Sequence, residues 1–78
     1  MEKTEIKIHS TYITLSQFLK FASIISSGGM AKPFLQQTEV FVNEEPENRR
    51  GKKLYDGDTI TIPNIGEFQI KSPAEKQK

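Results

Sequence analysis

The sequence contains no cysteine, no tryptophan and a single histidine, His9. Without cysteine the chain can form neither a disulfide framework nor a thiolate metal site, and one histidine cannot form a histidine cluster. No run of about 18 apolar residues is present, so the sequence predicts no membrane-spanning helix. The N-terminus also lacks the apolar core of a secretion signal, and we expect a cytoplasmic protein.

The chain is also short, which limits what it can enclose. Its 78 residues predict a single domain, 1–78, that buries only about 60–65% of its unfolded surface and has little volume for a deep active site. The carboxylates Glu44, Glu45 and Glu47 cluster in the sequence, but nothing around them predicts the burial that would raise a pKa for catalysis. We therefore expect a binding module and not an enzyme, without catalytic residues, metal site or cofactor.

Positive charge is concentrated in one place. Lys and Arg number 11 against 10 Asp and Glu, and four of the eleven fall within Arg49–Lys53, which we call the basic segment. Removing these four leaves 7 against 10, or −3, for the rest of the chain. A local cationic segment on a weakly acidic chain indicates one defined surface for an anionic partner, and a solvated surface turn is the simpler alternative.

Two helices are predicted in the first half of the chain. Thr14-Leu15-Ser16-Gln17 fits a capping box, and apolar residues then recur at helical spacing until about Ser26. The following Ser27-Gly28-Gly29 is expected to end this helix, because glycine accepts the left-handed conformation common at helix ends. A shorter helix is expected from about residue 29 or 30 to Gln37, with Pro33 in its first turn.

Strands are predicted on both sides of these helices. Alternating apolar and polar residues predict an edge strand within Thr4–Tyr12, and three further strands are expected at 40–42, 59–62 and 67–70. Residues typical of turns separate the later strands, so the basic segment lies in a connection between strands. The polar stretch Ser72–Lys78 is expected to be frayed.

The apolar positions of the helices and strands define a predicted core. Its members are Phe18, Leu19, Ala22, Ile25, Phe34, Leu35, Val40, Val42, Leu54, Ile60 and Ile62. Ile24 lies off the main helical stripe and is expected to be exposed. His9 is expected on the solvent side of its strand. Tyr55, beside Leu54, is expected in the core or at its rim, with stacking on a base as the alternative.

The order and spacing of these segments resemble the S4 RNA-binding domain over about residues 13–62. The resemblance rests on Leu15…Phe18-Leu19-Lys20, Ala31-Lys32, Val40-Phe41-Val42-Asn43 and Leu54-Tyr55-Asp56-Gly57-Asp58-Thr59-Ile60. The chain is most similar to the small standalone bacterial S4 proteins of the YaaA type, which consist of little more than this module. The resemblance implies an α+β fold, S4-like or alpha-L, with a two-helix hairpin on a small, mostly antiparallel sheet, here with extra N- and C-terminal strands.

The resemblance also implies binding of structured RNA along the helix face and the adjoining loop. Many S4 domains carry basic residues where this chain has Thr14, Gln17 and Gly28, so the basic segment is expected to compensate, because Lys and Arg gain by replacing counterions at phosphates. Gly51 within the segment would let the backbone approach a phosphate closely, and an ordinary turn glycine is the equal alternative. The predicted RNA-binding residues are Gln17, Lys20, Lys32, Asn48, Arg49, Arg50, Gly51, Lys52 and Lys53.

The expected partner is structured RNA, with ribosomal RNA and transfer RNA both candidates, because recognition by shape leaves no base code to read. A monomer is the default expectation. The alternative is a protein-docking module whose surface combines the turn Glu44–Glu47, the basic segment and an exposed Ile24. A ubiquitin-like sulfur carrier is disfavoured, because the sequence ends in Glu75-Lys76-Gln77-Lys78 and not in Gly-Gly.

Overall fold

The computed structural model describes residues 3–73. The elements in chain order are β1 (Lys3–Lys7), β2 (Tyr12–Thr14), α1 (Leu15–Phe21), the 3₁₀ helix η1 (Gly28–Met30), α2 (Ala31–Gln37), β3 (Phe41–Val42), β4 (Glu45–Pro46), β5 (Lys53–Tyr55), β6 (Thr59–Ile62) and β7 (Gly66–Lys71). No helix in this part of the chain is long and apolar enough to cross a membrane. The predicted α+β class is confirmed.

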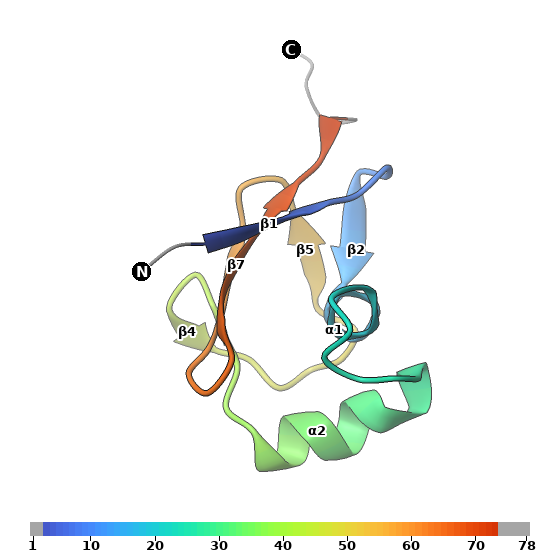
Figure 1. Ribbon diagram of the computed structural model, residues 1–78, viewed down its shortest axis with the longest axis vertical. Coiled ribbons are helices and arrows are strands. Elements are labelled where there is room, and N and C mark those ends of the chain that lie inside the picture. Colours follow the sequence, from blue (N-terminus) through green and yellow to red (C-terminus); the bar gives the residue numbers. More distant parts are fainter. Residues whose placement is uncertain (1–2, 74–78) are drawn as a thin grey trace.

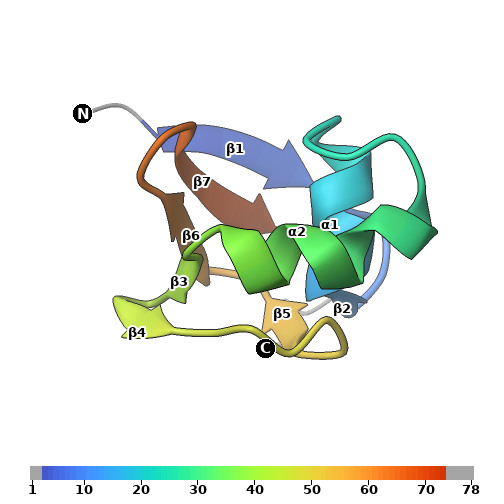
Figure 2. The ribbon, with the colours of Figure 1, turned by 90° about the horizontal axis from the view of Figure 1, so that it is seen from below.

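The strands form two sheets. The larger one has the order β1-β7-β6-β3-β4, and the smaller one pairs β2 with β5. Only β1 and β7 run parallel among these pairs, so the sheet is mostly antiparallel, and β1 lies at its edge as predicted. Figures 1 and 2 show α1 beside the β2–β5 pair and α2 lying across one end of the molecule.

The core lies between the larger sheet, the β2–β5 pair and the two helices. The buried hydrophobic residues are Ile6, Ile8, Leu15, Phe18, Leu19, Ile25, Ala31, Leu35, Val40, Val42, Leu54, Ile60, Ile62, Phe68 and Ile70. Most of the predicted core is therefore confirmed, with Ala22 and Phe34 only partly buried against it. The rings of Phe18 and Phe68 meet edge to face at 5.3 Å and join α1 to the larger sheet.

The start of α1 follows the predicted capping box. The Thr14 hydroxyl accepts from the Gln17 backbone N–H at 3.3 Å, and the Gln17 side-chain oxygen accepts from the Thr14 backbone N–H at 2.9 Å. These bonds satisfy donors that the first turn of a helix otherwise leaves unpaired. A purely local signal thus places the beginning of the helix.

The predicted end of α1 at Ser26 is wrong, because the helix ends at Phe21. Ser23 takes the left-handed conformation, with φ of 63°, that the sequence assigned to glycine. Its N–H donates to the Lys20 carbonyl at 3.0 Å, and the Ile24 N–H donates to the Leu19 carbonyl at 2.9 Å. This is a Schellman ending. Ile24 packs against the core immediately after it, so the prediction of an exposed Ile24 is also wrong.

The residues Asn43 and Asp58, which carried much of the resemblance, hold two turns together. The Asn43 side-chain amide donates to Asp58 Oδ1 at 3.1 Å, and its oxygen accepts from the Thr59 N–H at 3.0 Å. Asp58 Oδ2 accepts from the Tyr55 N–H at 2.8 Å and closes the turn around Gly57. These motif residues position the strand ends and are engaged within the fold.

Ser72, the first residue of the predicted frayed tail, is held in the fold. Ser72 is buried, its N–H donates to Asp56 Oδ1 at 2.8 Å, and its hydroxyl donates to the Ser10 carbonyl. The expectation of fraying is therefore wrong at Ser72, because these two bonds fix it against both the β5–β6 turn and the β1–β2 turn. The remainder of the predicted tail, 74–78, lies outside the described residues.

Candidate nucleic-acid interface

The backbone of the basic segment is hydrogen-bonded to the first residues of α1. The Leu15 N–H donates to the Lys52 carbonyl at 2.8 Å, and the Ser16 N–H donates to the Arg50 carbonyl at 2.9 Å. The first amides of a helix have no partner within the helix, and here the carbonyls of the basic segment supply it. The backbone from which the basic side chains project is therefore held in a fixed relation to α1.

The predicted RNA-binding residues are distributed over three surface depressions. Gln17 and Lys20 line the first, which we call the Lys20 depression. Lys32 of α2, Asn48 and Arg50 line the second, the Arg50 depression. The third, the Lys53 depression, is lined by Arg49, Gly51, Lys52, Lys53 and Tyr55. The structure thus brings Lys32 to the basic segment, whereas Lys20 lies in a separate hollow.

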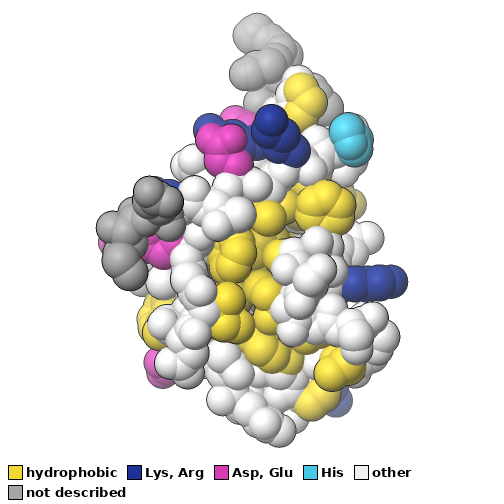
Figure 3. Space-filling view, viewed as in Figure 1, with side chains coloured by type: hydrophobic (Ala, Val, Ile, Leu, Met, Phe, Trp, Pro, Cys, Tyr) yellow, Lys and Arg dark blue, Asp and Glu magenta, His cyan; other side chains and the backbone are white. Residues whose placement is uncertain are grey.

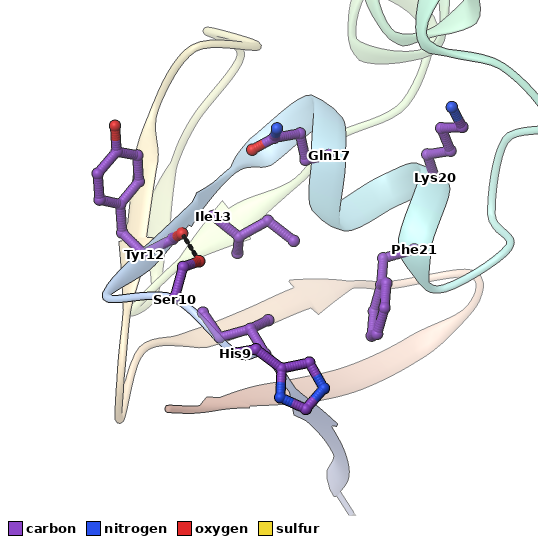
Figure 4. A pocket seen from close by; sticks show the side chains of 8 residues that line it. His9, Ser10, Tyr12, Ile13, Gln17, Lys20 and Phe21 are labelled. Atoms are coloured by element: carbon purple, nitrogen blue, oxygen red, sulfur yellow. Dashed lines mark hydrogen bonds between the residues drawn. The ribbon is translucent and has the colours of Figure 1, made fainter. Parts of the chain in front are cut away.

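The Lys20 depression lies between α1 and the turn that joins β1 to β2 (Figure 4). Lys20 and Gln17 extend from exposed positions of the helix, and Ile13 lies between them and the turn. Phe21 and His9 face each other at the other end, and His9 is exposed as predicted. The depression therefore combines apolar and aromatic surface with one cation.

Arg49 differs from its basic neighbours because it is paired. Its Nε donates to Glu47 Oε2 at 2.9 Å and its Nη2 donates to Glu47 Oε1 at 3.3 Å, while its backbone N–H also reaches the same carboxylate. Glu47 is largely covered, with 11% of its side chain exposed, against 73% for Arg49. The side-chain hydrogen bond from Arg49 lowers the pKa of Glu47 against the opposing effect of its burial, and it raises the pKa of Arg49.

This pairing changes the charge that the basic segment presents. Because the pKa of Glu47 is lowered from the usual carboxyl range, the carboxylate is ionised at neutral pH and offsets the charge of Arg49. Glu47 itself lines a neighbouring hollow with Glu39. Arg50, Lys52 and Lys53 have no such partner among the ion pairs of residues 3–73, so they carry most of the uncompensated charge of the segment.

The surface pairing of Tyr12 with Tyr55 is the feature that sequence reasoning missed. Tyr12 on β2 and Tyr55 on β5 are 39% and 44% exposed, so Tyr55 does not lie in the core, the first of the two positions expected for it. The two residues are direct partners across the antiparallel pair, and their ring centroids are 5.7 Å apart. The available signal was the alternation of exposed Lys53, buried Leu54 and exposed Tyr55 along β5. This alternation predicts the surface pairing of Tyr55 with Tyr12 only once β2 is known to pair with β5.

The molecule also has hydrophobic surface away from the basic side chains (Figure 3). Figure 3 shows hydrophobic side chains gathered in the middle of one face, with the visible Lys and Arg side chains near its edge. Within residues 3–73 no group of three His, Cys, Asp or Glu residues is placed to hold a metal ion.

A family model described as the S4 domain matches residues 6–71, and the chain therefore belongs to the S4 domain family. The resemblance deduced from the sequence is thereby confirmed. One relative, from Bacillus subtilis (strain 168), is named "Probable ribosome maturation protein RlbA". It is 58% identical over 65 residues, which cover 83% of this chain and 92% of the relative.

Proposed function

We propose that this chain is a non-catalytic module that binds structured RNA in the course of ribosome maturation, in the cytoplasm. Membership of the S4 domain family supports the RNA-binding part of the proposal. The name of the Bacillus subtilis relative supports the link to the ribosome, since the two chains match over most of both lengths. Ribosomal RNA is the leading candidate partner, with transfer RNA as the alternative.

The observation that carries the proposal is the attachment of the basic segment to the helices. The carbonyls of Arg50 and Lys52 accept from the first amides of α1, and the side chain of Arg50 shares a depression with Lys32 of α2. Cations from two distant parts of the sequence are thus held beside each other on a fixed backbone. Fixed cations lose little freedom when phosphates bind, which favours a rigid, folded RNA target.

The proposed contact residues remain Gln17, Lys20, Lys32, Asn48, Arg49, Arg50, Gly51, Lys52 and Lys53. Within this set the structure favours a central role for Arg50, because it is exposed and unpaired among the described ion pairs. Arginine presents a planar fork that can bind two phosphate oxygens at once. A neighbouring phosphate would then meet Lys32, which lines the same depression.

Binding to RNA is expected to weaken steeply with salt. If about four to six phosphates are contacted, log K plotted against log salt should fall with a slope of about −3 to −5, because each contact releases a condensed counterion. Binding isotherms at several salt concentrations, on an RNA recovered with the protein by crosslinking in cells, measure this slope. A flat slope, or the absence of any crosslinked RNA, would favour the protein-docking alternative.

Within the basic segment, Arg50→Ala should reduce the salt slope by about one unit. Arg49→Ala should have a smaller effect, because Glu47 already offsets its charge. The informative control is Glu47→Gln, which removes the carboxylate charge and leaves Arg49 uncompensated. That variant should bind RNA more tightly than wild type at low salt, and equal effects of the two arginine variants would contradict this division of roles.

A further inference from the structure

We infer that Tyr12 and Tyr55 form a stacking platform for unpaired bases of the RNA. The RNA that binds would then include single-stranded nucleotides as well as folded regions. The inference rests on the proposed function, since it concerns the same partner. It starts from the two faces of the β2–β5 pair. Leu54 is buried on the inner face and is paired with Ile13, which packs partly buried against the core, whereas the residues on either side of them point outward.

The outer face brings the two aromatic rings together. Tyr12 lies directly opposite Tyr55, and their rings are tilted by 47° with centroids 5.7 Å apart. Exposed fractions of 39% and 44% leave ring surface accessible on both. Tyrosine pairs usually bury more of their apolar surface when their role is packing, and neither ring belongs to the core cluster. These are two rings presented to solvent by a paired backbone.

A cation accompanies the rings. The ammonium group of Lys53 lies 5.0 Å from the centre of the Tyr12 ring, within the range of a cation–π contact. Lys53 is paired with Thr14 across the same two strands, so it projects from the same face as the tyrosines. A base that stacks on these rings would therefore have its phosphate close to a positive charge.

The platform also joins two of the depressions. Tyr12 lines the Lys20 depression and Tyr55 lines the Lys53 depression. Among residues 3–73, no Asp or Glu side chain lines either depression, and together the two contain Lys20, Arg49, Lys52 and Lys53. Aromatic rings flanked by cations without carboxylates are suited to single-stranded nucleic acid, in which bases can stack and phosphates remain in reach.

The chain allows a direct test, because it contains two tyrosines and no tryptophan. Its ultraviolet emission therefore reports on the platform alone. We compare a blunt-ended RNA duplex with the same duplex carrying a single-stranded oligoadenylate extension. The extended RNA should quench the tyrosine emission and bind more tightly, whereas the blunt duplex should bind through its phosphates with little quenching.

Three kinds of variant, five proteins in all, separate the effect of the ring from that of the charge. Tyr12→Leu and Tyr55→Leu should each reduce the affinity for the extended RNA by about 5- to 150-fold, the range expected for loss of one stacked base, and leave the blunt duplex unaffected. The Phe variants at the same positions keep the ring and should keep the preference for the extended RNA. Lys53→Gln should instead weaken both RNAs to a similar extent, and thermal melts verify that each variant is folded.

The outcomes distinguish this inference from the proposed function. If the extension adds no affinity in wild type, or if the Leu variants keep its full advantage, the platform is overturned while salt-dependent binding of the blunt duplex still supports an RNA-binding module. In that case the rings are better explained as a contact surface for a protein. If neither RNA binds, the proposed function and the platform fall together.

Discussion

Phe18→Ala should lower the free energy of unfolding by about 3–5 kcal/mol, the usual cost of removing a buried phenyl ring. The Phe18 side chain is fully buried, and its ring meets Phe68 of β7 edge to face at 5.3 Å. Such aromatic pairs add about 0.5–1.5 kcal/mol beyond the area they bury. Because a domain of this kind is stable by only about 5–15 kcal/mol, urea unfolding should show a large shift of the midpoint.

The same helix supplies a matched control. Phe21 is the same residue type three positions later, and its side chain is 58% exposed. Phe21→Ala should change the free energy of unfolding by less than about 1 kcal/mol, because little packing is lost. Similar costs for the two variants would show that α1 does not attach to the larger sheet through Phe18.

Local signals in the sequence predicted the parts of this fold that depend on local chemistry. The capping box at Thr14 needs only its own four residues to form, and the turn that contains Gly57, with φ of +91°, lies where residues typical of turns separate the later strands. Helical periodicity likewise identified the buried side of α1. In each case the energy that decides the conformation comes from neighbours in the sequence.

The end of α1 could not be found in the same way. Sequence reasoning favoured the glycines at 28 and 29, since a left-handed serine costs about 1–2 kcal/mol more than a left-handed glycine. In the structure Ser23 accepts that cost, and Ile24 then packs against the core. The compensating energy comes from tertiary packing, which a reading of local propensity does not include.

The candidate site likewise has some features that the sequence predicts and others that it does not. The concentration of charge in the basic segment is visible in the sequence, and the family match agrees with the function that it indicated. The pairing of Arg49 with Glu47 depends on the loop conformation, and the neighbourhood of Arg50 and Lys32 depends on how α2 packs. The tyrosine pair depends on the register between two strands far apart in the chain. The last two are tertiary contacts, and the first needs a particular loop conformation, so one sequence holds little information about any of them.

Gly57→Val should lower the free energy of unfolding by about 1–3 kcal/mol, the usual cost of holding a residue in a disfavoured backbone conformation. Gly57 has φ of +91°, which a β-branched residue strongly resists. A Cβ at this position would meet no atom within 4 Å, so the cost comes from the backbone and not from a clash. The Gly57 N–H also donates to the Ile70 carbonyl at 2.8 Å and ties the turn to β7. Urea unfolding measures the change.

Two further variants make the backbone explanation testable. Gly51 is exposed, has no positive φ, and would also place a Cβ in open space, so Gly51→Val should alter stability by less than about 0.5 kcal/mol. Gly57→Asn should cost less than Gly57→Val, because asparagine tolerates positive φ better than valine does. RNA affinity, measured where each variant is folded, should be reduced by the change at Gly57 only in proportion to any loss of folded protein. A stable Gly57→Val protein that has lost RNA binding would instead make Gly57 a contact residue and move the interface to the β5–β6 turn.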